Sequence, residues 1–195
     1  MLKIAIVGNI AAGKSSVEKL LKGKNFKVYD TDLLCHDILD NSKDKIIETF
    51  SDYDILDENN NISRKKLGDI VFEHTEYKNK LEGIIYPQLK ENLTEIFKNN
   101  QSENFLFISI PLLFEVGWEN LFDKILFVYA DDDLRLKRLM ARNSLTEEQA
   151  KKRLLSQKPQ EDKIKKSDFI IRNNDDILSL QKEIDEFIIL LKDME

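Results

Sequence analysis

The sequence predicts an α/β fold in which helices cover both faces of a parallel β-sheet. Short apolar runs of strand length alternate with longer amphipathic stretches, and a loop with a glycine at each end joins the first run to the first stretch. This alternation is typical of parallel strands connected by helices. The expected strands are Leu2–Val7, Phe26–Tyr29, Phe105–Ile110, Ile125–Tyr129 and Phe169–Ile171.

The helices of the repeating pattern are expected at Ser15–Leu21 and Ile177–Leu191. Two further regions do not fit a simple strand–helix repeat. Residues 33–100 hold several helical patterns and no convincing strand, and residues 132–158 resemble two helices joined by a short polar turn. We interpret both regions as helical insertions on one core.

The second helix of the 132–158 insertion carries its own start signal. Thr146 is followed three residues later by Gln149, the spacing of a capping box. The turn before it, Asn143–Leu145, is therefore the expected tip of this insertion.

Composition excludes several classes of protein. The chain has 195 residues, a formal net charge of −6 and 42% hydrophobic residues, which is typical of a globular domain. It contains no apolar run long enough for a transmembrane helix and no visible secretory signal. Its acidity disfavours a general nucleic-acid binder, and the lone Cys35 excludes an intramolecular disulfide and fits a reducing compartment. We expect a single domain over 1–195 that is cytoplasmic and binds neither nucleic acid nor membrane; the oligomeric state stays open.

Residues 8–15, GNIAAGKS, match the phosphate-loop pattern G-x-x-x-x-G-K-[ST] without a mismatch. Gly8 and Gly13 permit a backbone path that turns several N–H groups toward one phosphate, and the following helix adds its positive end. Lys14 can reach the β- and γ-phosphates, and the Ser15 hydroxyl can ligate Mg²⁺. The sequence therefore predicts a nucleotide site that uses Mg²⁺.

Among phosphate-loop proteins, a small-molecule kinase fits best. No Asn-Lys-x-Asp motif of a GTPase is present, and the apolar run 105–110 ends in Pro111 where a motor ATPase would carry an acidic residue. Asp131 follows another apolar run, but residues 131–133 are more simply acidic residues at the start of the next helix. Small kinases also close helical insertions over their substrates.

Two carboxylates follow the second expected strand, in the segment Tyr29–Asp32. Ligand sites of open α/β sheets lie at the carboxyl ends of the strands, so a carboxylate here could accept the proton of an attacking hydroxyl. Alternatively, Asp30 or Asp32 only caps the helix that follows. The sequence alone leaves both interpretations open.

Arg135, Arg138 and Arg142 are spaced to lie on one helix face. Three guanidinium groups on one face could clamp a transferring phosphate. The alternative is a solvated face paired with the acidic residues 131–133, but the phosphate loop favours a functional role for at least one of the three.

The segment Ile110–Glu115 follows the third expected strand and could line a substrate pocket. The alternative is ordinary core packing, which we favour for Leu112 and Phe114.

Taken together, these motifs resemble the dephospho-CoA kinase family, which phosphorylates the ribose 3′-hydroxyl of dephospho-coenzyme A with ATP in the last step of coenzyme A biosynthesis. The matching segments span nearly the whole chain. They are residues 8–15, Val28–Asp32, Leu67–Phe72, Leu81–Pro87, Pro111–Glu115, Arg138–Arg142, Gln157 and Asp168–Asn173.

The resemblance implies a five-stranded parallel sheet in the order 2-3-1-4-5, a coenzyme A-binding region over about 33–100 and a lid over about 132–158. It implies Asp32 as general base and Arg138 as the lid arginine. With Lys14 of the phosphate loop and Arg142 of the arginine face, the predicted catalytic residues are Asp32, Lys14, Arg138 and Arg142. ATP would be bound by Gly8, Ala11, Ala12, Gly13, Lys14, Ser15, Ser16, Arg172 and Asn173. The acceptor would be bound by Asp32, Arg64, Tyr86, Pro87 and Leu113.

The chain also departs from the family pattern. Tyr86 stands where the family usually has His, the loop interior is richer in alanine, and Ser16 replaces the usual Thr. Two rival interpretations remain: another small-metabolite or nucleotide kinase of the same fold, and a nucleotide-binding switch without turnover.

Overall fold

The computed structural model describes residues 1–194, which form two compact units. Residues Met1–Tyr29 and the chain from Asn100 onward make the first, here called the core unit. Residues Asp30–Asn99 make the second, the helical unit.

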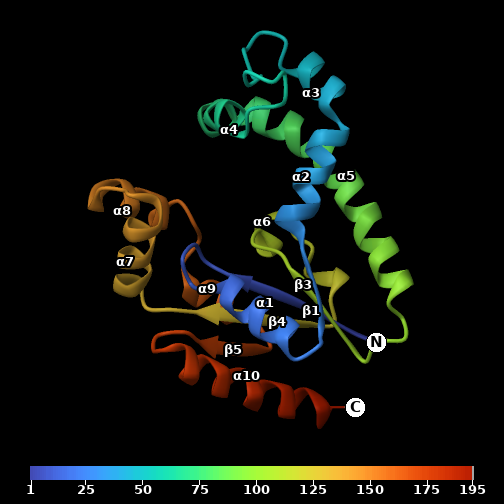
Figure 1. The fold of residues 1–195 in the computed structure, drawn as a ribbon, viewed down its shortest axis with the longest axis vertical. Coiled ribbons are helices and arrows are strands. Elements are labelled where there is room, and N and C mark those ends of the chain that lie inside the picture. The colour runs from blue at the N-terminus through green and yellow to red at the C-terminus, as the bar shows by residue number, and fades with distance from the viewer. Residues whose placement is uncertain (195) are drawn as a thin grey trace. The chain divides into compact units, whose positions relative to one another are not determined.

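The described chain contains a five-stranded sheet in the order β2-β3-β1-β4-β5, as predicted (Figure 1). Strand β1 pairs in parallel with β3 and with β4, and β4 pairs in parallel with β5. The strands are β1 (Leu2–Gly8), β2 (Lys27–Asp30), β3 (Phe105–Ser109), β4 (Lys124–Tyr129) and β5 (Phe169–Arg172). All five predicted strands exist, with ends shifted by one residue at most.

Strand β2 starts at Lys27, one residue later than predicted, so Phe26 precedes the strand. Asn25 has a left-handed φ of 66°, which turns the chain just before the strand. The Phe26 ring then packs edge-on against Phe107, with ring centroids 5.4 Å apart.

One face of the sheet is covered by α1 (Lys14–Gly23) and α10 (Ile177–Lys192). Alternate residues of the strands, such as Ile4 and Ile6 of β1, join the apolar faces of these two helices in one buried cluster. Because side chains alternate along a strand, this period of two fixes which residues face the helices. Both helices were predicted; α1 is longer by one residue at its start and two at its end, and α10 by one residue at its end.

The remaining helices of the core unit follow β3 and β4. They are α6 (Leu113–Val116), the 3₁₀ turn η1 (Glu119–Leu121), α7 (Asp132–Asn143), α8 (Glu147–Leu155) and α9 (Gln160–Ile164). The predicted capping box at the start of α8 is confirmed, with Thr146 and Gln149 bonded reciprocally. Ser144, in the predicted turn, has a left-handed φ of 51°. The short α9 was not predicted.

The helical unit consists of α2 (Thr31–Asn41), α3 (Lys43–Thr49), α4 (Arg64–Glu73) and α5 (Thr75–Asn99). Its small core includes Phe50 and Leu67, with Tyr53 and Tyr77 packed against it. Within this fully described stretch the β-structure consists of an isolated bridge between Leu56 and Ile62. The helical character predicted for this region is therefore confirmed.

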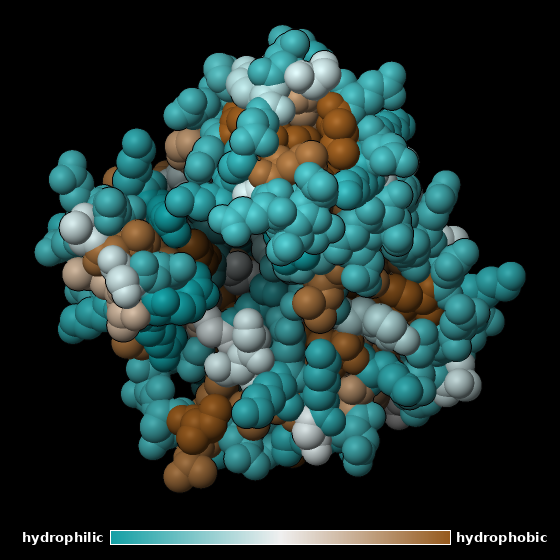
Figure 2. Space-filling model, turned by 45° about the horizontal axis from the view of Figure 1, so that its top comes forward, coloured by the Kyte–Doolittle hydropathy of each residue, from teal (hydrophilic) through white to brown (hydrophobic). Residues whose placement is uncertain are grey.

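Most of the surface visible in Figure 2 is hydrophilic, with apolar side chains in separate patches. Within residues 1–194, no helix is long and apolar enough to cross a bilayer.

Candidate active site

The phosphate loop connects the end of β1 to the start of α1, so it lies at the carboxyl edge of the sheet. Ala11 and Gly13 have left-handed φ values of 62° and 96°. These two positions reverse the chain so that α1 starts at Lys14, and residues 14–16 form its first turn. A Cβ added to Gly13 would overlap the side-chain amide of Asn173. The second glycine of the motif is therefore required both by its conformation and by its neighbour.

Side chains far away in sequence hold this loop in place. Asn173, directly after β5, donates from Nδ2 to the carbonyl of Ala12 at 2.8 Å. From the segment after α8, Gln157 accepts from the backbone N–H of Ile10 at 2.7 Å. Asn9 donates from Nδ2 to the Lys158 carbonyl at 3.0 Å. The loop is thus supported by β5 on one side and by the 132–158 insertion on the other.

Arg135 is a further support of the loop. Its side chain is only 3% exposed, its Nε donates to the Ile10 carbonyl at 3.0 Å, and its Nη1 pairs with Asp132 at 2.7 Å. Burial lowers the pKa of its guanidinium, and Asp132 acts in the opposite direction. Arg135 therefore does not belong to a solvated face; it is a buried structural residue.

Arg138 lies one turn further along α7. Like the Nη2 of Arg135, its Nη1 is buried and, within the described residues, has no hydrogen-bond partner. This atom lies 3.9 Å from where a Cβ of Gly13 would be, directly beside the phosphate loop. A buried donor without a partner is costly, so an acceptor is expected here when the site is filled.

Arg142 is exposed at the end of α7, where its Nε donates to Asn143 at 3.0 Å. The three arginines of the predicted face therefore differ: Arg135 supports the loop, Arg138 lies beside Gly13, and Arg142 is exposed.

The side chain of Lys14 makes contacts that sequence reasoning missed. Its Nζ lies 3.0 Å from Oε1 of Glu18 and also contacts Oγ of Ser109, the last residue of β3. Ser109 in turn donates to the same Glu18 oxygen at 2.6 Å. The i,i+4 spacing of Lys14 and Glu18 on α1 was the available signal. That Glu18 would be buried could be known only from the sheet order, which sets β3 beside β1.

Asp30 and Asp32 take different positions at the start of α2. Asp30 is the N-cap and accepts a hydrogen bond from the backbone N–H of Asp32 at 3.0 Å, so the capping interpretation is confirmed for Asp30. Asp32 lies in the first helical turn with an exposed side chain. Nearby, burial, Asp32 and Asp30 raise the pKa of the Cys35 thiol to about 11, which keeps it protonated at neutral pH.

Residues after β3 differ in part from the prediction. Phe114 is buried, as expected, but Leu112 is 45% exposed, so core packing was the wrong interpretation for that residue. Leu113, a predicted acceptor contact, is fully buried at the start of α6. The short helix α6 directs Leu113 inward and Leu112 outward, and the sequence did not reveal this helix.

The helical unit contains a pocket of about 650 Å³ that includes Arg64. Arg64 is the first residue of α4, after the N-cap Ser63, and Lys43 supplies a second cation to the same pocket. Tyr86 and Pro87 lie in the middle of α5, where the Tyr86 hydroxyl donates to Glu82 at 3.0 Å. Asp40 and Asp57 also line the pocket, so it holds charges of both signs, and neither Tyr86 nor Pro87 is among its lining residues.

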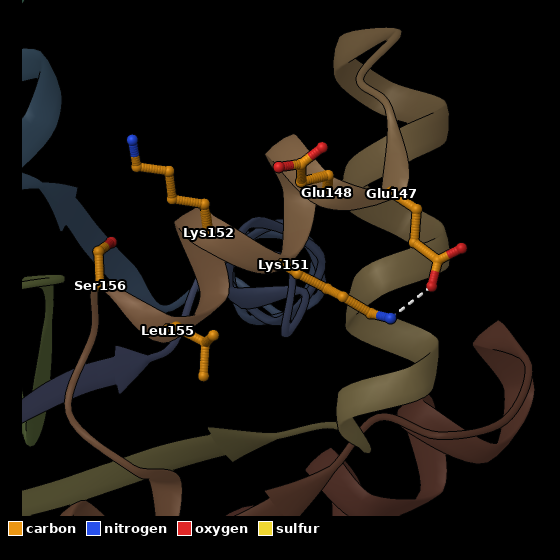
Figure 3. Close-up of a pocket in the computed structure, with 6 residues that line it drawn as sticks. All are labelled: Glu147, Glu148, Lys151, Lys152, Leu155 and Ser156. Carbon is orange, nitrogen blue, oxygen red and sulfur yellow. Dashed lines mark ion pairs between the residues drawn. The ribbon is translucent and has the colours of Figure 1, made fainter.

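A second hollow, of about 740 Å³, lies against α8. It is lined by Glu147, Glu148, Lys151, Lys152, Leu155 and Ser156, and Figure 3 shows Lys151 paired with Glu147 while Lys152 projects separately. No residue predicted for the site lines this hollow. Arg172, a predicted ATP contact, donates from its backbone N–H to Glu183 at 3.2 Å.

Comparison with known proteins decides the family. The sequence profile of the dephospho-CoA kinase family matches residues 2–179. The chain belongs to the dephospho-CoA kinase family. A dephospho-CoA kinase of Fusobacterium nucleatum is 41% identical and covers 94% of this chain and 95% of its own length. One of Listeria innocua is 37% identical, with 95% and 94% covered.

Solved structures agree with this family assignment. A dephospho-CoA kinase from Campylobacter jejuni matches with a TM-score of 0.74 and 36% identity, covering 99% of this chain and 98% of that one. A crystal structure from Thermus thermophilus matches with a TM-score of 0.88 and 29% identity, covering 97% and 96%. Dephospho-CoA kinases are ATP-dependent enzymes of coenzyme A biosynthesis, so the expectation of a kinase is confirmed over that of a switch without turnover.

Replacement of Gly13 tests the packing of the loop. We expect Gly13→Ala to lower kcat/KM for ATP by about 10²-fold, because the loop must move by roughly 1 Å to relieve the overlap with Asn173. Gly23→Ala is the matched control on the same helix, since a Cβ there meets nothing within 4 Å. Steady-state kinetics with both variants measures the difference, and equal behaviour of the two would contradict the tight packing.

Proposed function

We propose that this protein transfers the γ-phosphoryl group of ATP to the ribose 3′-hydroxyl of dephospho-coenzyme A, with Mg²⁺, in the cytoplasm. The observation that carries the proposal is the unpartnered Nη1 of Arg138 beside Gly13 in a complete phosphate loop. It supplies a buried cationic donor where a phosphate would lie against the N-terminus of α1.

Phosphate binding is assigned to the loop and the first turn of α1. Backbone N–H groups of Ala11 and Gly13, together with the helix N-terminus, favour negative charge there, while the Ala12 N–H donates to the Asn9 carbonyl at 3.0 Å and closes the turn of the loop. Lys14 adds a mobile ammonium group and Arg138 a rigid fork of donors. Asn173 supports the loop through Ala12, and we assign it to the adenine side together with Arg172.

The residues present fit a bound Mg²⁺ in one respect. Ser15 is exposed in the first turn of α1, so its hydroxyl oxygen is available beside the position of the phosphates. Oxygen ligands of this kind suit Mg²⁺, which takes its other ligands from phosphates and water. When bound, the ion would neutralise charge on the phosphate oxygens.

The acceptor is assigned to the helical unit. Asp32 accepts the proton of the attacking 3′-hydroxyl, a role that Asp30 does not share because its carboxylate already caps α2. Arg64 and Lys43 suit the anionic groups of the acceptor in their common pocket. Tyr86 and Pro87 are assigned to the wall of the acceptor site, where Tyr86 offers a hydroxyl and no imidazole.

Residues 132–158 are assigned to a lid over ATP. Arg135, Gln157 and the Lys158 carbonyl attach this segment to the phosphate loop, so its position is coupled to the loop that binds the phosphates. Arg142, exposed at the end of α7, is available to a phosphate when the lid closes. Exclusion of water protects the γ-phosphate from hydrolysis when no acceptor is bound.

The direct test is acceptor-dependent formation of ADP by the purified protein. We expect ADP to form with dephospho-coenzyme A and ATP, and product analysis to show phosphate on the 3′-hydroxyl. A panel of nucleosides, nucleotides and shikimate serves as the control. A faster reaction with a member of that panel would replace the proposed acceptor by another.

Removal of Lys14 separates catalysis from stability. Lys14→Ala should lower kcat by about 10²–10³-fold, the cost of losing a contact to charge that develops in the transition state. It should also lower stability by about 3 kcal/mol, because Glu18 loses its buried counter-ion. The double variant Lys14→Ala/Glu18→Gln should recover the lost stability, measured by thermal unfolding, but not the lost activity. Wild-type turnover in either folded variant would refute the assignment of the loop.

The two aspartates should respond differently to the same change. Asp32→Asn should lower kcat by roughly 10²–10⁴-fold with little change in the Kd for ATP, since only the proton acceptor is lost. Asp30→Asn should be mild, because Asn caps a helix about as well as Asp. Kinetics and ATP titrations of both variants measure this, and the reverse ranking would move the base to Asp30.

Arg138 and Arg135 provide a second matched pair. Arg138→Ala should lower kcat by about 10³-fold, and Arg138→Lys should recover only part of it, because lysine lacks the bidentate fork. Arg135→Ala should act mainly on the melting temperature, since Arg135 supports Ile10 and Asp132. Small and equal effects on kcat would remove Arg138 from the phosphate site.

A further inference from the structure

Glu18 is a buried carboxylate that the proposed mechanism does not use. Its side chain is only 7% exposed, and it lies on α1 one turn after the phosphate loop. A charge in such a place requires compensation, which here comes from the Lys14 ammonium group at 3.0 Å and from the Ser109 hydroxyl at 2.6 Å. Both donors reach the same oxygen, Oε1.

This contact engages the side chain that is proposed to bind the phosphates. Nζ of Lys14 contacts both the Glu18 carboxylate and the Ser109 hydroxyl, so two of its three N–H donors are engaged within the core unit. The Glu18 carboxylate is therefore an anion of the protein itself that holds the ammonium group of the loop.

We propose that Glu18 competes with the phosphates of the nucleotide for Lys14 and thereby sets the affinity of the loop. This inference rests on the proposed function in one respect, namely that Lys14 binds nucleotide phosphate. Binding of ATP takes Lys14 from Glu18, and return of Lys14 to Glu18 favours release of ADP.

Ser109 makes this exchange feasible. When Lys14 moves to a phosphate, the Ser109 hydroxyl still donates to Glu18, so the carboxylate retains a hydrogen bond in the core of the unit. Ser109 is fully buried at the end of β3 and cannot move with the ligand. The fixed hydroxyl thus holds Glu18 in place while the flexible lysine side chain moves between two anions.

The test measures nucleotide affinity in Glu18→Gln, which keeps the size and removes the charge. We expect the Kd for ATP and for ADP, measured by calorimetry, to fall about tenfold, the worth of one hydrogen bond to a charged group. The KM for ATP should fall with it and kcat should not rise, because tighter ADP slows release. The matched control is Asp185→Asn, which removes the carboxylate paired with Lys24 just after the other end of α1 and should leave Kd unchanged.

A double-mutant cycle identifies the route of the effect. In the Lys14→Ala background, Glu18→Gln should change the Kd for ATP far less than in the wild type, because the contested side chain is gone. If Glu18→Gln does not fold, Glu18→Met supplies a neutral residue of similar shape with the same expected result. Thermal unfolding of each variant establishes that the protein is folded.

Several results would overturn the inference. A higher KM for ATP together with a lower kcat in folded Glu18→Gln would mean that Glu18 positions Lys14 for catalysis. An unchanged Kd would mean that the two anions do not compete. Because ATP titration needs no acceptor, a tenfold gain in affinity without acceptor-dependent ADP would refute the proposed function and leave this inference standing.

Discussion

The close packing of Gly13 against Asn173 is the constraint on which the rest of the site depends. Gly13 adopts a left-handed conformation and leaves no room for a side chain, because the Asn173 amide occupies that space and bonds the Ala12 carbonyl. This contact requires β5 to end beside the loop that follows β1. The sheet order provides it, since β4 lies between β1 and β5 and all three strands run parallel. The loop geometry is thus a property of the whole sheet, although its motif is eight residues long.

The loop is also bonded to residues 132–158. Arg135 and Gln157 bond the carbonyl and the N–H of Ile10 from opposite ends of that segment, and Asn9 bonds the carbonyl of Lys158. A loop of small residues has few side chains with which to hold its own shape. Its conformation is therefore held by partners from α7 and from the chain after α8. Any movement of this segment must alter those bonds, which couples residues 132–158 to the phosphate loop through identified atoms.

Short-range sequence patterns predicted the strands, the phosphate loop and the helix cap. They did not predict contacts between side chains that are distant in sequence. The strands, the α1 phosphate loop and the capping box at Thr146 follow from short-range patterns, and all are confirmed. The stripe Arg135, Arg138, Arg142 was equally regular, yet spacing cannot tell which guanidinium turns toward Ile10 and which reaches Gly13. The pairing of Lys14 with Glu18 and Ser109 was missed because it needs β3 beside β1. Leu112 was misassigned because α6 is only four residues long and has no periodicity of its own.

These contacts also determine the charge that an entering nucleotide meets. Lys14 is paired with Glu18, and Arg135 with Asp132. Nη2 of Arg135 and Nη1 of Arg138 are buried donors without a hydrogen-bond partner within the described residues. An anion that reaches either of these atoms breaks no existing ion pair, whereas an anion that binds Lys14 competes with Glu18 for the same ammonium group. Under the proposed function, the two kinds of contact therefore differ in cost before any property of the ligand is considered.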